Sequence, residues 1–144
     1  MKTLILRYLL VGVTALSLSP TAFAQEPAGA HLSMELNAAQ SEEQSCKLSF
    51  LVINGRGSDI LKAVFETVLF DAQGQVDRLT LFDFGALPAG RPRVRQFVVS
   101  GTRCEYLGQI LFNGVNTCEA EDMDATACES GLQLNSRTTI KVTG

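Results

Sequence analysis

The sequence is poor in the residues that most often carry catalysis. It contains no tryptophan and a single histidine, His31. No serine lies in a Gly-x-Ser-x-Gly motif, and no two cysteines have the Cys-x-x-Cys spacing. A serine or cysteine hydrolase needs a base beside its nucleophile, and a zinc or redox site needs closely spaced thiols or imidazoles. These absences argue against both classes, and we expect no cofactor and no metal site.

Long apolar runs are absent after residue 18, and the one that is present lies at the N-terminus. Lys2 and Arg7 precede an apolar run over residues 8–18, and small residues follow it up to Ala24. This order is typical of a secretory signal peptide and predicts cleavage between Ala24 and Gln25. The alternative, an uncleaved anchor, would need about 20 apolar residues. We therefore predict a periplasmic or secreted protein with no membrane span once residues 1–24 are removed.

The remaining chain is long enough for one core and too short for two. We expect a flexible leader over residues 25–30 and a single domain over residues 31–144. Loss of Lys2 and Arg7 leaves ten basic residues against fifteen acidic ones, a net charge of −5 with His31 neutral. This balance argues against nucleic acid as a partner.

Four cysteines lie in the mature part, and an even number in an exported chain predicts disulfide bonds. Three pairings are possible for two bridges. We favour Cys46 with Cys104 and Cys118 with Cys128. The close pair flanks a polar loop, and the distant pair begins two predicted strands.

Alternating or β-branched segments separated by Gly, Pro and Asn predict about seven strands. These cover residues 31–36, 46–53, 63–70, 75–84, 94–99, 104–112 and 138–142. Residues 37–45 and 113–131 are polar and are predicted as loops, with a helical turn at residues 124–128 capped by Asp124. The pattern favours an all-β fold, an antiparallel β-sandwich, over a small barrel.

Two resemblances add to this pattern. Residues 46–99 resemble an uncharacterised family of small exported alphaproteobacterial proteins. More loosely, Asn54, residues 64–71, Gly74, residues 87–90 and Phe97 are similar to FxLYD-type immunoglobulin-like domains. Such domains carry a strand that ends in an aromatic residue and Asp-x-x-Gly, then a Pro-Gly turn before a strand with Phe. The resemblance implies an immunoglobulin-like sandwich and non-catalytic binding, but the four cysteines depart from it.

The best candidate for a binding site is a run of arginines. Arg91, Arg93 and Arg95 occupy alternate positions, so a strand would place them on one face, where they can bind a carboxylate or phosphate. Phe97 shares their parity and should face the core. The arginines must therefore lie over a sheet edge or follow a twist.

The alternative interpretation of these arginines is structural. They would protect a sheet edge and form exposed ion pairs with Asp77 and Asp83 across the hairpin.

Two further clusters favour a structural interpretation. Carboxylates in the region of the second pair of cysteines form an acidic loop that does not match the spacing of a calcium loop and is expected to be solvated: Glu119, Glu121, Asp122, Asp124 and Glu129. Phenylalanines spread over several strands are expected to form the shared core: Phe50, Phe65, Phe70, Phe82, Phe84 and Phe97.

Together these patterns predict a non-catalytic exported binding or protein-interaction module. Its partner would be another periplasmic protein or an anionic ligand. Two alternatives stay open: a small hydrolase that uses carboxylates, and a structural subunit that exchanges strands with its neighbours.

Overall fold

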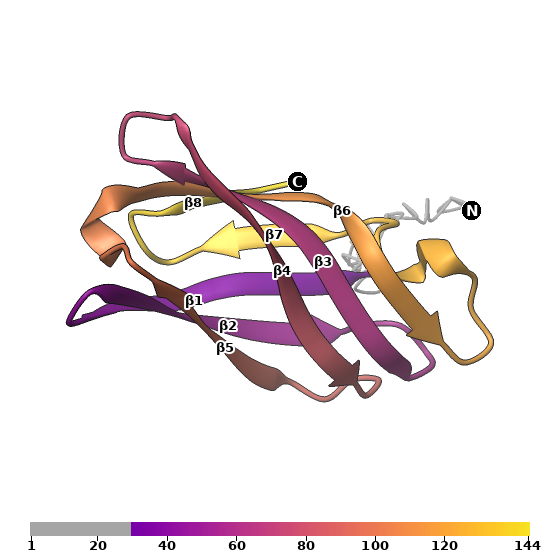
Figure 1. Cartoon of the computed structure of the whole chain (residues 1–144). Coiled ribbons are helices and arrows are strands. Elements are labelled where there is room, and N and C mark those ends of the chain that lie inside the picture. Colours follow the sequence, from indigo (N-terminus) through magenta and orange to yellow (C-terminus); the bar gives the residue numbers. More distant parts are fainter. Residues whose placement is uncertain (1–29) are drawn as a thin grey trace, which may run out of the picture.

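The computed structural model describes residues 30–144, which form two four-stranded β-sheets (Figure 1). In spatial order, one sheet contains β5 (Arg93–Ser100), β2 (Ser45–Asn54), β1 (Leu32–Glu42) and β7 (Gln133–Ser136). The other contains β4 (Val76–Leu87), β3 (Ile60–Asp71), β6 (Leu107–Ala120) and β8 (Lys141–Thr143). Two short 3-10 helices, η1 (Cys104–Tyr106) and η2 (Ala125–Cys128), lie on either side of β6. The predicted all-β sandwich is confirmed.

The predicted signal peptide and residues 25–29 of the predicted leader lie outside the described residues. Within residues 30–144, no helix is long and apolar enough to cross a membrane.

Strand pairing is antiparallel except at one side of the sandwich. There the short strands β7 and β8 pair parallel to β1 and β6, over four and three residue pairs respectively. β7 was not predicted, because residues 133–136 are mostly polar and too few to show a period. The strand predicted over residues 104–112 begins only at Leu107, because its first residues form η1. The strand predicted over residues 138–142 likewise begins only at Lys141, as β8.

Two strands continue through segments that were predicted to be loops. β1 extends to Glu42 and β6 to Ala120, although residues 37–45 and 113–131 are polar. Residues 37–42 are exposed or half-exposed, and a bulge at Asn37 shifts the register between Leu36 and Ala38. In β6, Val115, Cys118 and Ala120 pack against the core, but register shifts between Phe112 and Gly114 and between Val115 and Thr117 break the two-residue period. The sequence pattern therefore did not indicate these strand halves.

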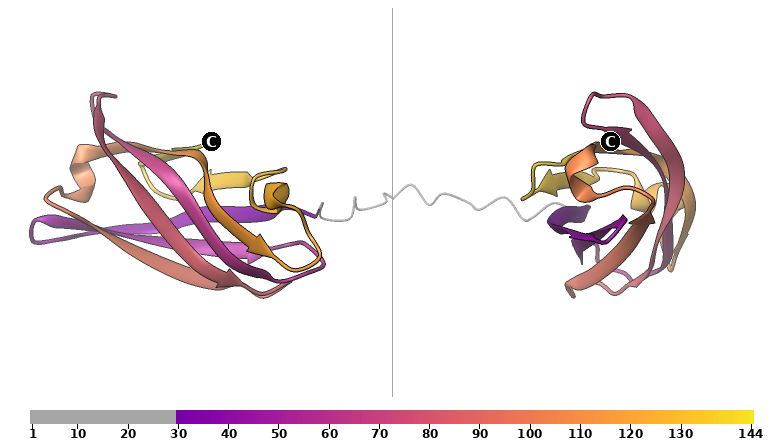
Figure 2. Two further views of the ribbon diagram at one scale, coloured as in Figure 1. Left: turned by 45° about the vertical axis from the view of Figure 1, so that its right-hand side comes forward. Right: turned by 60° about the vertical axis from the view of Figure 1, so that its left-hand side comes forward.

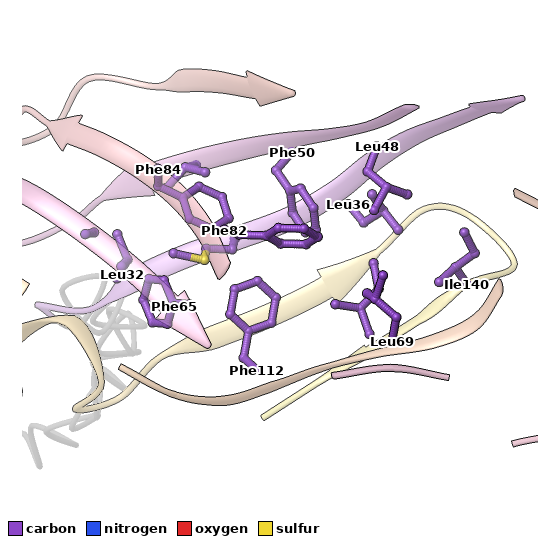
Figure 3. Packing of buried hydrophobic residues seen from close by; sticks show 14 of the residues in the cluster. Leu32, Leu36, Leu48, Phe50, Phe65, Leu69, Phe82, Phe84, Phe112 and Ile140 are labelled. Carbon is purple, nitrogen blue, oxygen red and sulfur yellow. The ribbon is translucent and has the colours of Figure 1, made fainter. Parts of the chain in front are cut away.

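The core lies between the two sheets, which curve around it (Figure 2). Its centre is a group of aromatic rings that point toward one another from both sheets (Figure 3). Phe50 of β2 packs edge-on against Phe84 and Phe112, with ring centroids 5.6 and 6.0 Å apart. Phe65, Phe82 and Phe84 are buried as predicted, whereas Phe70 is only half-buried. Such edge-to-face contacts stabilise beyond simple burial of area.

Both disulfide bonds are present in the pairing that the sequence favours. Cys46 of β2 is bonded to Cys104 of η1, and Cys118 of β6 is bonded to Cys128 of η2. The first bridge attaches η1, which connects β5 of one sheet to β6 of the other, to β2. The second attaches η2, and with it the acidic loop, to the end of β6. The predicted turn after Asp124 is also present, because its carboxylate accepts a hydrogen bond from the N–H of Thr126.

Candidate binding surface at the β4–β5 seam

Strands β4 and β5 are edge strands of different sheets and lie side by side without pairing through their backbones. The rings of Phe82 (β4) and Phe97 (β5) stack on the interior side, with centroids 4.3 Å apart and planes at 9°. We call this line of contact the seam. It is the place where the unpaired edges of both sheets meet, and exposed edges need protection from other chains.

Arg95 of β5 closes much of this seam. Its Nε donates to the carbonyl of Phe84 at 2.6 Å, and its Nη2 donates to the carbonyl of Ala86 at 2.9 Å. Both carbonyls belong to β4. The guanidinium thus occupies two acceptors to which a further strand would otherwise bind.

A second arginine crosses the seam in the other direction. Nη1 of Arg78, on β4, donates to the carbonyl of Ser100 at the end of β5, at 2.7 Å. Arg78 also forms an ion pair with Asp77, in which Nε and Oδ2 are 2.6 Å apart. The fork of each guanidinium suits this role, because it offers several donors in a fixed plane.

The three arginines singled out in the sequence do not form one patch with one role. Arg95 bonds to β4 as described, and Arg93 donates to the carbonyl of Pro92 at 3.1 Å. Arg91 precedes β5 and is exposed. None of the three belongs to the ion pairs found within residues 30–144, so the expected pairs with Asp77 and Asp83 are not formed.

The register explains why Arg93 and Arg95 reach the edge. They are opposite Val52 and Phe50 of β2, whose side chains are buried, so both arginines start on the interior side of the sheet. Because β5 has no neighbour beyond it, their long side chains can turn outward over the edge. The sequence argument had named this arrangement as one of two possibilities.

On the outside of the seam, four aliphatic side chains are exposed to solvent. Leu79 and Leu81 of β4 are 63% and 52% exposed, and Val94 and Val98 of β5 are each 60% exposed. Leu81 precedes Phe82 and Val98 follows Phe97 in sequence. Because successive strand residues point to opposite faces, these two lie outside the stacked rings. We call the four aliphatic residues the seam surface.

Sequence reasoning missed the seam surface, although a signal for it was present. In β5, apolar residues occupy both parities, with Phe97 and Val99 on one and Val94 and Val98 on the other. A strand that is apolar on both sides is usually covered on both sides. For an edge strand of a sandwich, the outer side is covered only if something binds there.

A separate cleft of about 400 Å³ opens beside the turn between β3 and β4. Asp71 of this turn and Glu105 of η1 both line it. The pKa of Glu105 lies below its ordinary value of 4.5, because its own backbone N–H and the Ser41 hydroxyl donate hydrogen bonds to its carboxylate. A general acid in a glycosidase needs a raised pKa, so the lowered pKa of Glu105 does not suit it to that role.

The acidic loop has a structural role at Asp124. Its pKa lies below 3.8, because the side chain and then the backbone N–H of Thr126 donate to its carboxylate. Across residues 30–144, no group of three or more His, Cys, Asp or Glu side chains is placed to hold a metal ion.

No family model matches this chain. Comparison with curated proteins and with solved structures likewise returned no match. Function must therefore be argued from the seam, the cleft and the disulfides alone.

Proposed function

We propose that this protein is an exported, immunoglobulin-like, non-catalytic module that binds a partner protein through the seam surface. The observation that carries the proposal is the exposure of Leu79, Leu81, Val94 and Val98 on two adjacent edge strands. Exposed aliphatic residues are ordinary when scattered, but a group of them on one side of a small protein is typical of an interaction site.

The charges around the seam surface favour a partner that carries carboxylates next to apolar residues. Arg91 lies just before β5 and Arg93 begins it, next to Val94, and neither arginine forms an ion pair within the described chain. An apolar centre with arginine at its rim is a common composition of protein interfaces. The anionic group that the sequence predicted as a ligand would thus be a carboxylate on the surface of the partner protein.

Export to the periplasm or beyond is supported by the two disulfides, since such bonds persist in oxidising compartments. The immunoglobulin-like classification is supported by the two packed sheets and by contacts between residues of the FxLYD-like pattern. The amide of Asn54 bonds to Leu87, and the N–H of Gly90 bonds to the carbonyl of Asn54 at 2.7 Å.

The strand-exchange alternative is weakened by Arg95, which occupies the β4 carbonyls that an incoming strand would need. For the hydrolase alternative, the lowered pKa of Glu105 argues against this residue as the general acid of the cleft. Neither alternative explains the seam surface.

The test compares matched variants of the tagged, oxidised protein. Partners are captured from the native compartment, identified by mass spectrometry and purified, and their affinity is then measured for each variant. Leu81→Lys and Val98→Lys should weaken binding by about tenfold or more, as expected when a charge enters the centre of an apolar interface. Leu61→Lys, at a 49% exposed position on β3, is the control and should bind normally. Equal binding by all three variants would refute the proposal.

A further inference from the structure

The cleft beside the β3–β4 turn has a rigid floor and walls. Oδ1 of Asp71 accepts hydrogen bonds from the N–H groups of Gln73 and Gln75, at 2.9 and 2.8 Å, which fixes the turn. The N–H of Ala72 donates to the carbonyl of Tyr106 at 2.9 Å, which fixes the turn to η1. The shape of the cleft is therefore set by the backbone.

Gly108 is required where β6 passes beneath this turn. A Cβ atom at this position would lie 2.5 Å from the carbonyl oxygen of Asp71, closer than any side chain tolerates. Gly108 lines the cleft, so the close approach of the two backbones forms part of its floor. Glycine serves such approaches because it has no side chain.

Both carboxylates of the cleft are held in position before any ligand arrives. Oε2 of Glu105 accepts from the Ser41 hydroxyl at 2.8 Å, and Oε1 is 2.7 Å from Nε of Arg103. The lowered pKa keeps Glu105 ionised at neutral pH. Asp71 is held by its own turn through Oδ1, which leaves Oδ2 for other partners. Groups that are already fixed lose little entropy on binding.

The same cleft is lined by a positive charge from another element. Lys141 and Thr139 belong to the segment at β8, on the opposite side of β6 from β3. Strands two positions apart in a sheet are roughly 9–10 Å apart. Lys141 forms no ion pair within 4.0 Å in the described chain, whereas Glu105 is already paired with Arg103, so Lys141 is not neutralised directly by Asp71 or Glu105.

We propose that this cleft binds a small zwitterion that carries both an ammonium group and a carboxylate. The ammonium binds Oδ2 of Asp71, on the side of the cleft where Glu105 is already paired with Arg103, and the carboxylate binds Lys141 and the hydroxyl of Thr139. A ligand with both charges satisfies both sides of the cleft, whereas an ion of one sign meets an uncompensated like charge. This site is separate from the seam surface and does not depend on the function proposed there.

The test is an NMR titration of the oxidised protein with glycine, β-alanine and γ-aminobutyrate, which differ in the spacing of their charges. Methylammonium and acetate, each with one charge, are the matched probes. At least one zwitterion should shift the amide signals of Gly74, Gly108 and Lys141. It should bind about tenfold or more tightly than either single-charge probe, the difference expected for one charge-assisted hydrogen bond.

Variants on both sides of the cleft separate this site from general electrostatics. Lys141→Gln and Asp71→Asn should each weaken the zwitterion by about tenfold, and Asp71→Asn keeps Oδ1 as the acceptor of the turn. Lys62→Gln and Glu119→Gln are the controls. These two residues face each other on β3 and β6 at the other end of the strands and should leave binding unchanged. Unchanged amide spectra elsewhere establish that each variant is folded.

Three results would overturn the proposal. The first is that no zwitterion shifts the cleft signals at tens of millimolar. The second is that acetate or methylammonium binds as tightly as the best zwitterion, which indicates a site for a simple ion. The third is that the control variants weaken binding as much as the cleft variants do.

Discussion

Nδ2 of Asn54 donates a hydrogen bond to the carbonyl of Leu87 at 2.8 Å, across a sequence separation of 33 residues. The same nitrogen donates to the carbonyl of Ser58 at 3.0 Å, and Oδ1 accepts from the N–H of Arg56 at 3.0 Å. Asn54 is only 1% exposed. One buried amide therefore joins the end of β2, the loop after it and the end of β4.

Replacing Asn54 with alanine should destabilise the fold strongly. The substitution leaves carbonyls and an N–H without their partners, and each buried unsatisfied group costs about 1–3 kcal/mol. We expect a loss of about 2–4 kcal/mol in the free energy of unfolding, measured by urea denaturation. Asn116→Ala, at an exposed position, is the control and should change stability by less than about 0.5 kcal/mol. A loss as small as that of the control would contradict the role given to Asn54.

Substitution of Arg95 should lower stability, whereas substitution of Arg91 should lower only partner binding. Arg95→Ala removes two hydrogen bonds across the seam and uncovers two β4 carbonyls, so we expect a loss of about 1–3 kcal/mol and self-association at high concentration. Arg91→Ala should weaken partner binding and leave the thermal midpoint unchanged. Denaturation and size-exclusion chromatography measure the first pair of effects. A stable, monomeric Arg95→Ala variant would show that the seam does not need this residue.

The two disulfides should contribute unequally to stability. Cys46 and Cys104 are 58 residues apart in sequence, whereas Cys118 and Cys128 are only 10 apart. A longer closed loop restricts the unfolded chain more, by about 1.5 kcal/mol for these two lengths in the chain-entropy description. The double variant Cys46→Ala/Cys104→Ala should therefore unfold at lower urea than Cys118→Ala/Cys128→Ala. The reverse order would indicate that anchoring of η2 outweighs chain entropy.

Glu105 should make folding sensitive to acid. Its pKa in the folded protein lies below the ordinary value of 4.5, so its stabilising effect is complete above that value and is lost as the pH falls through the folded pKa. Glu105→Gln should flatten the pH dependence of stability below about pH 4.5 relative to the parent protein. Glu43→Gln, in the exposed turn after β1, serves as the comparison. Identical acid profiles for the parent and Glu105→Gln would contradict the assignment.

The sequence predicted the parts of this fold in which one face of a strand is buried and the other is exposed. Leu32, Met34 and Leu36 alternate with polar residues and are all buried, as the pattern indicated. The disulfide pairing is the one that the sequence favoured among three, because Cys46 and Cys104 each begin a predicted extended segment. The second halves of β1 and β6, which are mostly polar and are interrupted by register shifts, show no regular alternation and were not predicted.

The candidate site was only partly predictable. Residues 94–99 were predicted as a strand, and a position of Arg91, Arg93 and Arg95 over a sheet edge was one of two arrangements that their spacing allowed. The acceptors of Arg95 are carbonyls of β4, and backbone acceptors leave no mark in a sequence. The cleft was invisible for a similar reason. It brings together Asp71, Glu105 and Lys141, and only the tertiary fold places these distant residues beside one another.

The central claim is that the seam surface is covered by a partner protein in the native compartment. Site-specific photo-crosslinking in living cells tests it most directly, with the reactive residue placed at position 81, at position 98 and, as the control, at position 61. We predict the same single adduct from positions 81 and 98 and none from position 61. An absence of adducts at both seam positions, or an equal yield at position 61, would contradict the claim.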